Sequence, residues 1–347
     1  MDLITLVIRL TKMELAHCLS NYASRKKSPY TTEVFSNKLS VSHGVAPDDL
    51  FKIFSSYLIA FFSALPRALA LLLLVSCCGV LFCQAQKNKP QFKVIAFYTG
   101  KRDTAHLSFV HEANRWFPKI AARYNFIYDS TNDWSHLNAK FLSHYQVVIF
   151  LDTRPEQPAQ REAFKKYMDH GGAWMGFHFA GFALTPSDYP QNWDWYHNVF
   201  IGAGQYKGNT WRPTSAILRV EDSTHPVTRH LPQTFRSSPN EWYSWEKDIR
   251  TNPDIKILLS IDSTSFPLGT GPKSYEIWHS GYYPVVWTNK KYKMLYLNMG
   301  HNDIDYEHKT NKELSFQFDN AIQNELVTNG ILWLGRATAH NRKLESY

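Results

Sequence analysis

Residues 171–181 read GGAWMGFHFAG, and this stretch decides the fold. Its two leading glycines end a helix that we predict over 157–170, because glycine readily adopts the left-handed conformation that closes a helix. Ala173–Phe177 is then a short apolar run of the kind found in strands buried on both faces. His178 follows the predicted strand directly. A helix, a buried strand and a polar loop residue in this order indicate an α/β protein.

The residues before this stretch repeat the alternation of strand and helix. Phe92–Tyr98 (FKVIAFY) and Val147–Leu151 (VVIFL) are apolar runs that predict buried strands, and 126–128 predicts a shorter one. Between them, apolar residues at helical spacing predict a helix over 106–124. Such alternation implies right-handed βαβ units and a mostly parallel sheet with helices on both faces.

The second half of the chain is less regular. We predict a short aromatic helix over 193–201 and a long closing helix over 311–335. Four apolar stretches predict further strands at 215–220, 255–261, 283–287 and 294–297. There is no internal repeat, so we expect one folded domain over 91–335, followed by a tail over 336–347.

The segment before residue 86 indicates export from a bacterial cell. Ala68–Cys83 is an uncharged apolar run as long as the core of a signal peptide, and an arginine precedes it. We expect 67–85 to be a cleaved signal peptide; an uncleaved membrane anchor and a lipoprotein signal ending at Cys77 are the alternatives. The sequence of residues 1–66 shows no pattern that predicts structure. A start codon placed too early would explain why so many residues precede the signal segment. The expected location is the periplasm, with the protein either free or anchored to the membrane.

Composition excludes several functions. All four cysteines, at positions 18, 77, 78 and 83, precede Gln86, so the domain has no thiolate nucleophile, no disulfide and no cysteine-bound zinc. The formal net charge is +8, but the basic residues form no run and no nucleic-acid-binding motif. We therefore expect no nucleic-acid partner, and contact with a membrane only through the N-terminal segment.

Polar residues that follow predicted strands are candidates for a functional site, because ligands of parallel α/β sheets bind beyond the carboxyl ends of the strands. His178 could serve there as acid, base or metal ligand, or could simply bond to a backbone carbonyl. His301 follows another strand and is joined by Asn302 and Asp303. Glu241 lies among aromatic residues, where desolvation would raise its pKa and suit it to acid or base catalysis. A solvated Glu241 on an amphipathic strand is the alternative.

Aromatic residues are abundant, with 11 Trp and 19 Tyr. Aromatic rings beside hydrogen-bonding side chains suit sugar binding, because the C–H faces of pyranoses stack on them. The candidate sugar-binding residues are Trp195, Tyr196, Trp211, Trp242, Tyr243, Asn302 and Asp303. Packing in the core is the alternative, and it is the commoner role of aromatic side chains.

Several motifs follow one another in a recognisable order. After 171–181 come W-x-W-Y at 193–196, HPVTRHLP at 225–232, NEWY at 240–243, PVVW at 284–287 and KMLYLNMGH at 293–301. Their order and spacing resemble the ThuA-like (trehalose utilisation) family of the class I glutamine amidotransferase-like superfamily. The resemblance implies a flavodoxin-like, three-layer α/β sandwich with a mostly parallel sheet. It also implies that His178 occupies the strand-to-helix turn where amidotransferases carry their cysteine.

The family's pattern implies that His178, Glu241 and His301 line one pocket. We predict that they are catalytic residues, and two histidines with one carboxylate could also hold a divalent metal such as zinc. Two departures stand out: Asn240 replaces a common Asp, and 204–211 lacks a histidine that would be a third imidazole. The predicted function is an exported enzyme, hydrolytic or isomerase-like, acting on a sugar or keto-sugar derivative by acid–base or metal-assisted chemistry. A carbohydrate-binding protein without turnover is the alternative. A cysteine amidotransferase is excluded.

Overall fold

The computed structural model describes residues 89–101, 103–184, 192–276, 278–279 and 281–344. The expected N-terminal extension (1–66) and signal segment (67–85) lie outside the described residues. No helix among the described residues is long and apolar enough to cross a membrane.

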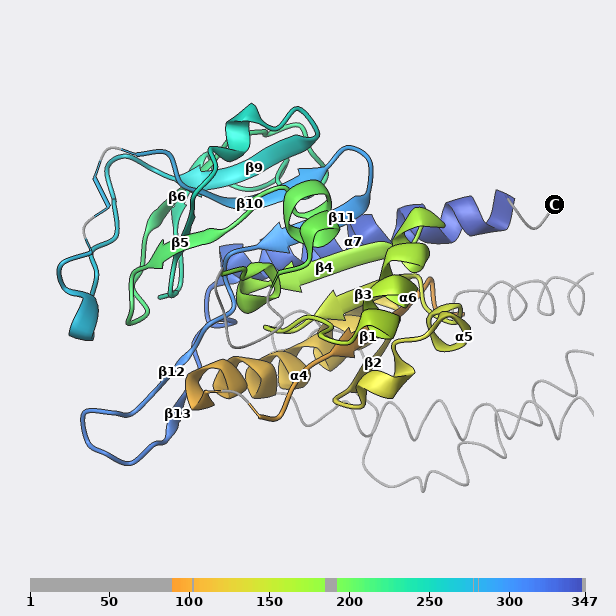
Figure 1. Cartoon of the computed structure of the whole chain (residues 1–347), viewed down its shortest axis with the longest axis horizontal. Coiled ribbons are helices and arrows are strands. Elements are labelled where there is room, and N and C mark those ends of the chain that lie inside the picture. The colour runs from red at the N-terminus through yellow and green to blue at the C-terminus, as the bar shows by residue number, and fades with distance from the viewer. Residues whose placement is uncertain (1–88, 102, 185–191, 277, 280, 345–347) are drawn as a thin grey trace, which may run out of the picture. The chain divides into compact units, whose positions relative to one another are not determined.

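A nine-stranded mixed sheet forms the core, in the order β2-β1-β3-β4-β11-β10-β9-β6-β7 (Figure 1). The first five strands are parallel neighbours: β2 (Ile127–Thr131), β1 (Lys93–Phe97), β3 (Val147–Phe150), β4 (Ala173–Phe177) and β11 (Lys293–Leu297). The last four extend the sheet by antiparallel pairing: β10 (Pro284–Asn289), β9 (Ile255–Ile261), β6 (Ile217–Val220) and β7 (Thr234–Arg236). The apolar runs predicted as strands are confirmed, and every residue of β3 and β4 is buried.

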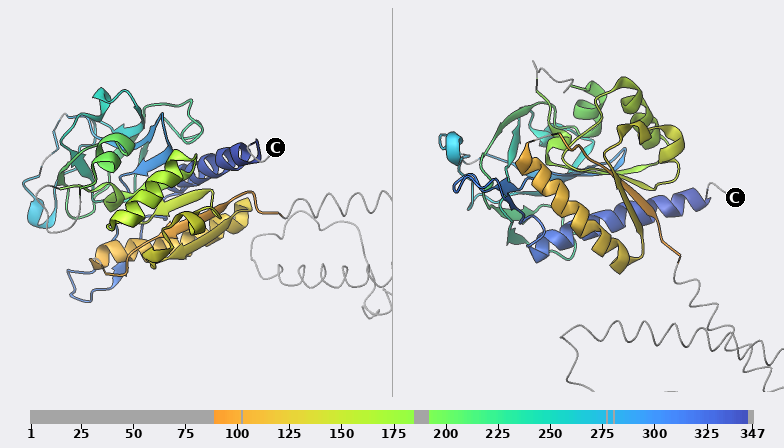
Figure 2. Two further views of the ribbon diagram at one scale, coloured as in Figure 1. Left: turned by 45° about the vertical axis from the view of Figure 1, so that its right-hand side comes forward. Right: turned by 90° about the horizontal axis from the view of Figure 1, so that it is seen from below.

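Helices cover both faces of the sheet, which confirms the predicted three-layer sandwich. One face is covered by α4 (Thr104–Tyr124) and α7 (Ala321–Leu344), which Figure 2 shows from below. The other face is covered by α5 (Ala139–Leu142), α6 (Pro158–Asp169) and the π-helix η3 (Trp195–Phe200). Each buried phenylalanine in these layers contributes about 1.5–3 kcal/mol to the free energy of unfolding.

Short elements complete the chain and were not predicted. They are the 3-10 helices η1 (Trp134–His136), η2 (His178–Gly181), η4 (Ile249–Thr251) and η5 (Gly271–Lys273), the ribbon of β5 (Tyr206–Asn209) with β8 (Tyr243–Trp245), and the ribbon of β12 (Asp303–Ile304) with β13 (Glu313–Leu314).

The closing helix differs from its prediction at both ends. We predicted it over 311–335, but α7 begins at Ala321 and continues to Leu344, past the expected start of the tail. The Asn320 side chain accepts hydrogen bonds from the backbone N–H groups of Ile322 and Gln323, both at 3.0 Å. Asn320 therefore caps the helix and sets its first turn.

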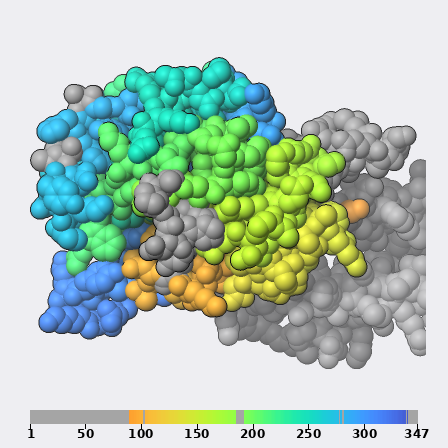
Figure 3. Space-filling view, in the orientation of Figure 1, coloured from red at the N-terminus to blue at the C-terminus, as the bar shows by residue number. Residues whose placement is uncertain are grey.

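A buried carboxylate explains why residues 311–320 are not helical. Glu112 on α4 accepts hydrogen bonds from the Asn302 side chain at 2.8 Å and from the backbone N–H groups of Gln317 and Phe318 at 3.1 Å. These contacts hold the chain on either side of the β12–β13 ribbon against α4, and the space-filling view shows the ribbon region beside the first turns of that helix (Figure 3). Backbone N–H groups bound to Glu112 are not available for a helical ladder.

Candidate functional site

His178 begins the turn that follows β4, at the carboxyl edge of the parallel strands. Its φ is +44°, a left-handed conformation that non-glycine residues rarely adopt, and its side chain is fully buried. The Tyr296 hydroxyl donates a hydrogen bond of 2.8 Å to the His178 carbonyl, which holds the turn in place. A Cβ at Gly181 would lie 2.7 Å from the Tyr296 ring, so only glycine fits there. A strained residue held by its surroundings is typical of a functional turn.

The two ring nitrogens of His178 have different partners. Nδ1 lies 3.2 Å from the carbonyl oxygen of Asn298. Because a carbonyl can only accept, Nδ1 is the nitrogen that carries a proton. Nε2 lies 3.0 Å from Oε2 of Glu241, and the Tyr243 ring packs on the imidazole with centroids 3.9 Å apart. His178 thus bonds to a backbone carbonyl, which was the structural alternative predicted for it, and it also faces a carboxylate.

Glu241 is buried, but the predicted rise in its pKa is wrong. Burial does raise the pKa, yet the imidazoles of His301 and His178 outweigh it and lower the pKa of Glu241 to about 2. The other carboxylate oxygen accepts a hydrogen bond of 2.5 Å from the Asn209 side chain, which itself accepts one of 2.6 Å from Lys273. Glu241 is therefore an ionised carboxylate, not a protonated acid.

His301 is positioned by the loop that follows β11. The Asn240 side chain accepts a hydrogen bond of 3.1 Å from the N–H of Gly300 and donates one of 3.0 Å to the Ser238 carbonyl. Gly300 has a φ of +128°, and a Cβ there would lie 2.9 Å from Cβ of Phe177. Asn240, which stands where the family commonly has Asp, therefore fixes the loop that carries His301.

The imidazole of His301 is buried without hydrogen-bond partners. The residue is 1% exposed, and among the described residues neither ring nitrogen has a partner. Burial lowers the pKa of His301 to about 3, so the ring is neutral at pH 7. Its Nε2 lies 3.8 Å from Oε2 of Glu241. Buried polar atoms in folded proteins normally have a partner, so these two ring nitrogens are available to bind a ligand.

His106, which no sequence motif marked, brings a third imidazole to the same place. It lies in the first turn of α4, a helix capped by Asp103 through a 2.8 Å hydrogen bond from the N–H of Ala105. Its ring centroid lies 4.5 Å from that of His301 and 5.6 Å from that of His178. The available signal was its position, one turn into the helix that follows β1 at the carboxyl edge of the sheet.

Asp152, at the end of β3, orients His106. One carboxylate oxygen bonds to Nδ1 of His106, and the other accepts a hydrogen bond of 2.8 Å from the N–H of Phe179. Asp152 is buried and has a φ of +54°. Burial acts to lower the pKa of His106, but Asp152 outweighs it and the pKa is raised. The carboxylate therefore ties the start of α4 to the turn after β4.

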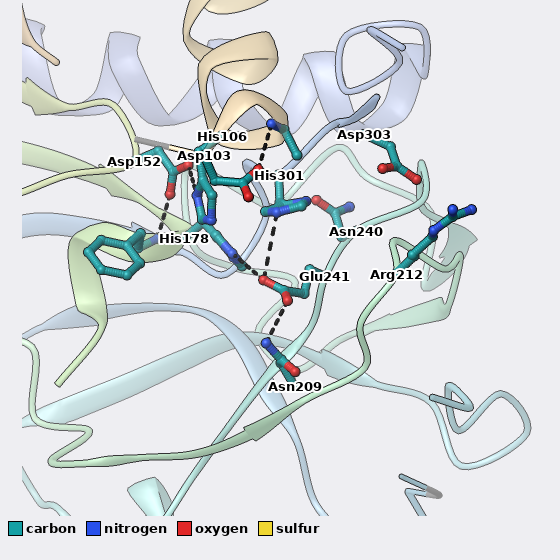
Figure 4. A network of polar contacts seen from close by, with 12 residues as sticks. Asp103, His106, Asp152, His178, Asn209, Arg212, Asn240, Glu241, His301 and Asp303 are labelled. Carbon is teal, nitrogen blue, oxygen red and sulfur yellow. Dashed lines mark hydrogen bonds and ion pairs between the residues drawn. The ribbon is translucent and has the colours of Figure 1, made fainter. Parts of the chain in front are cut away.

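Four side chains meet at this edge of the sheet, as Figure 4 shows. One ligand atom each from His106, His178, His301 and Glu241 lies within 4.8 Å of all the others. We call this group the histidine cluster. The structure thus brings together the three residues predicted from the motifs and adds His106, which supplies the third imidazole that 204–211 lacks. Nitrogen and oxygen donors at this spacing could hold a metal ion.

Some of the predicted sugar-binding residues lie beside the histidine cluster, and others have structural roles elsewhere. Tyr243 packs on His178, and the Trp211 ring lies 6.4 Å from that of His301. Asp303 is half-buried on β12, and burial raises its pKa. Asn302 instead binds Glu112 and is a structural residue.

Tyr196 and Trp242 are buried in the core, which corrects their predicted role in sugar binding, and Trp195 packs half-buried against the core. The Tyr196 hydroxyl donates a 2.9 Å hydrogen bond to the Ala180 carbonyl, and Trp195 stacks on Phe200. Trp242 is fully buried in the opposite layer, where its indole N–H donates to the Thr214 carbonyl at 2.8 Å. The physical reason is that these rings lie on the apolar faces of their segments, which the sheet buries.

A cavity of about 430 Å³ is lined in part by Tyr243, whose ring packs on His178. Aromatic and charged residues line it together, among them Glu276, Trp278 and Tyr282. A cavity of this volume and lining accommodates a small polar ligand with a face for stacking.

Comparison with protein families and solved structures agrees with this fold. The model of the ThuA family, described as trehalose utilisation, matches residues 94–334. A ThuA-like protein from Bacteroides uniformis ATCC 8492 is 35% identical, with a TM-score of 0.62, over 71% of this chain and 92% of its own. A ThuA-like protein from Parabacteroides merdae ATCC 43184 is 18% identical, with a TM-score of 0.49, over 71% of this chain and 90% of its own. No curated protein sequence matches the chain.

The family match spans nearly all of the sandwich, and it includes the strands and turns that position His178, Glu241 and His301. On the strength of that match and of the relative at 35% identity, the chain belongs to the ThuA family.

Proposed function

We propose that this protein is an enzyme of carbohydrate utilisation that acts on a sugar or keto-sugar derivative at the histidine cluster. Membership of the ThuA family supports the role in carbohydrate utilisation. The observation that carries an enzymatic role is the buried contact of His178 with the ionised Glu241, at 3.0 Å, beside the unpartnered ring of His301. Residues that serve only for packing rarely combine ionised and unpartnered groups in this way.

The cluster offers chemistry that a sugar requires. Sugar hydroxyls and carbonyls become reactive when an imidazole or a carboxylate moves a proton, or when a bound cation polarises the oxygen. Ordinary glycoside hydrolysis uses two carboxylates that flank the bond. Glu241 is the one carboxylate in the cluster, and Asp152 is engaged with His106 and the N–H of Phe179. The proposed reaction is therefore isomerase-like, or a hydrolysis that does not follow the two-carboxylate scheme.

Turnover of a panel of carbohydrates tests the proposal. Full-length protein would be incubated with trehalose, other disaccharides and their keto derivatives, with products detected by mass spectrometry and binding measured by calorimetry. We expect turnover of at least one compound and a loss of about 100-fold or more in His178→Gln, the range for general acid–base groups. His144→Gln is the matched control, since His144 is exposed and lies outside the cluster.

Two outcomes would change the conclusion. Binding of a sugar by wild type and His178→Gln alike, with no turnover of any compound, would favour the carbohydrate-binding alternative. Neither binding nor turnover of any carbohydrate would overturn the proposal.

We also propose that the protein acts outside the cytoplasm, in the periplasm or anchored to the membrane that faces it. The apolar run Ala68–Cys83 supports this, although it lies outside the described residues. Cell fractionation followed by sequencing of the mature N-terminus tests it. A mature chain that starts at Met1 in the cytoplasm would contradict it.

A further inference from the structure

We infer that the histidine cluster binds one divalent transition-metal ion through the imidazoles of His106, His178 and His301 and the carboxylate of Glu241. The inference deepens the proposed function, since it names how the same site polarises its substrate. It extends the ligand set suggested by the motifs with His106, and it gives Asp152 the role of a positioning residue.

The donor atoms are close enough to share one ion. They lie within 4.8 Å of one another, and the carboxylate oxygen lies 3.0 Å from His178 and 3.8 Å from His301. In tetrahedral coordination two ligands about 2.1 Å from one ion lie about 3.4 Å apart, so the widest pair of donor atoms would have to close by about 1.4 Å, a movement that its two side chains share.

His178 and Glu241 present acceptors to each other. The proton of neutral His178 lies on Nδ1, where it binds the Asn298 carbonyl, so Nε2 offers a lone pair. That lone pair faces a carboxylate oxygen of Glu241 at 3.0 Å. Two acceptors at this distance repel unless a positive charge joins them, and that charge is either a second proton on the ring or a metal ion.

His301 favours the metal over the proton. Both of its ring nitrogens are buried without partners among the described residues, and a proton shared between His178 and Glu241 leaves them so. An ion in the centre of the cluster would take the lone pair of His301 together with those of its neighbours. The same ion would remove the repulsion between Nε2 of His178 and the carboxylate of Glu241.

Asp152 prepares His106 for the same ion. Its carboxylate binds Nδ1 of His106 and leaves Nε2 as the ring nitrogen available to the cluster. Metal-bound histidines commonly donate their second ring N–H to a carboxylate, which fixes the ring and makes it a stronger ligand. The hydrogen bond from Phe179 to the other oxygen keeps Asp152 in this orientation.

The charge of the buried groups also suits a divalent cation. The side chains of Glu241 and Asp152 both lie in the interior, so a negative charge on either needs a partner there. Buried charges require compensation. Imidazole nitrogens with one carboxylate suit zinc among the divalent ions, and zinc can bind a fifth ligand, which would be a substrate oxygen or water.

Metal titration of the full-length protein tests the inference without an activity assay. The protein would be stripped with a chelator and titrated with Zn²⁺ by calorimetry, and with Co²⁺ by visible absorption, which reports the coordination number. We expect one ion per chain, and a fall in zinc affinity of about 100-fold or more in His106→Ala and Glu241→Gln. Asp152→Asn keeps the acceptor for Phe179 and should weaken affinity by about 10–100-fold. His144→Ala, outside the cluster, should bind as wild type does.

The outcomes separate this inference from the proposed function. Absence of stoichiometric Zn²⁺, Co²⁺ and Mn²⁺ binding by the wild type would overturn the metal site, while loss of turnover in His178→Gln would still support acid–base chemistry there. Stoichiometric metal binding without any carbohydrate turnover or binding would keep the site and reject the function. If circular dichroism shows that a variant does not fold, the wild type alone still tests the metal site. Zinc bound to the folded wild type must raise its melting temperature by several degrees.

Discussion

His301 and His197 are two buried histidines in different parts of the sandwich. They are 1% and 2% exposed, and burial lowers the pKa of each to about 3. His197 lies in the aromatic layer, where its Nδ1 accepts a hydrogen bond of 3.1 Å from the N–H of Trp193 and its Nε2 donates one of 3.2 Å to the Phe182 carbonyl. His301 has no such partners among the residues that the structure describes.

The difference shows what separates a site from a core. Both histidines are buried and both have a lowered pKa, so neither burial nor a lowered pKa identifies a functional residue by itself. The distinguishing feature is that the ring of His197 is satisfied by backbone groups of Trp193 and Phe182, whereas His301 faces Glu241 and two further imidazoles. A leucine in place of each histidine has nearly the same volume and removes the nitrogens, so the same substitution tests both regions.

The largest effect is expected at the cluster. His301→Leu should lower carbohydrate turnover by at least about 100-fold, because the ring is lost from the reacting group. The free energy of unfolding of the metal-free protein should stay within about 1 kcal/mol of wild type, since no hydrogen bond is broken. Steady-state kinetics and urea unfolding measure the two quantities. A variant that unfolds easily but turns over normally would show that His301 belongs to the core.

The converse is expected in the aromatic layer. His197→Leu should lower the free energy of unfolding by about 2–4 kcal/mol, because a backbone N–H and a carbonyl lose their partners in the interior. Turnover per folded molecule should not change. Urea unfolding with active-site titration checks both, and a stability loss below about 1 kcal/mol would contradict the role assigned to these hydrogen bonds.

Acid tests the burial of His197 in a second way. The pKa of His197 is about 3 in the folded protein, because of burial and the nearby Arg154, and near 6.5 in the unfolded chain. Between these values only the unfolded chain takes up the proton, so the stability contributed by His197 is complete above pH 6.5 and is lost as the pH falls toward 3. Relative to His197→Leu, the wild type should lose up to about 1.4 kcal/mol per pH unit in this window. Urea unfolding of both proteins from pH 7 to 4 measures it, and parallel curves would refute it.

The smallest effect is expected at Tyr196, which the sequence suggested as a sugar ligand. Tyr196→Phe removes the hydrogen bond to the Ala180 carbonyl and should cost about 1 kcal/mol of stability. Carbohydrate affinity measured by calorimetry should be unchanged, because the ring lies in the core. Weaker sugar binding at unchanged stability would move Tyr196 back into the site.

Local patterns were sufficient for the parallel half of the fold. Ala173–Phe177 and Val147–Leu151 are short apolar runs beside turn residues. Strands that are buried on both faces of a sheet consist almost entirely of apolar residues, so they can be recognised from the sequence. The order of motifs also pointed to His178, Glu241 and His301. The predicted helix over 311–335 failed because Glu112, far away in the chain, takes up the backbone N–H groups of the residues before Asn320.

What the sequence determined by itself is thus the α/β class, the parallel strands and the polar residues that follow them, since each depends on neighbours within a few positions. Tertiary structure alone decided that His106 joins the cluster, that Asp152 orients it, and that Trp195 and Tyr196 are packed away from it. The cluster depends on contacts between residues 46 or more positions apart, such as His106 with Asp152 and His178 with Asn298. The packing of the layers decides which side chains that are far apart in the sequence come into contact. The periodic pattern of one helix or strand shows only which of its faces is buried, so it cannot predict these contacts.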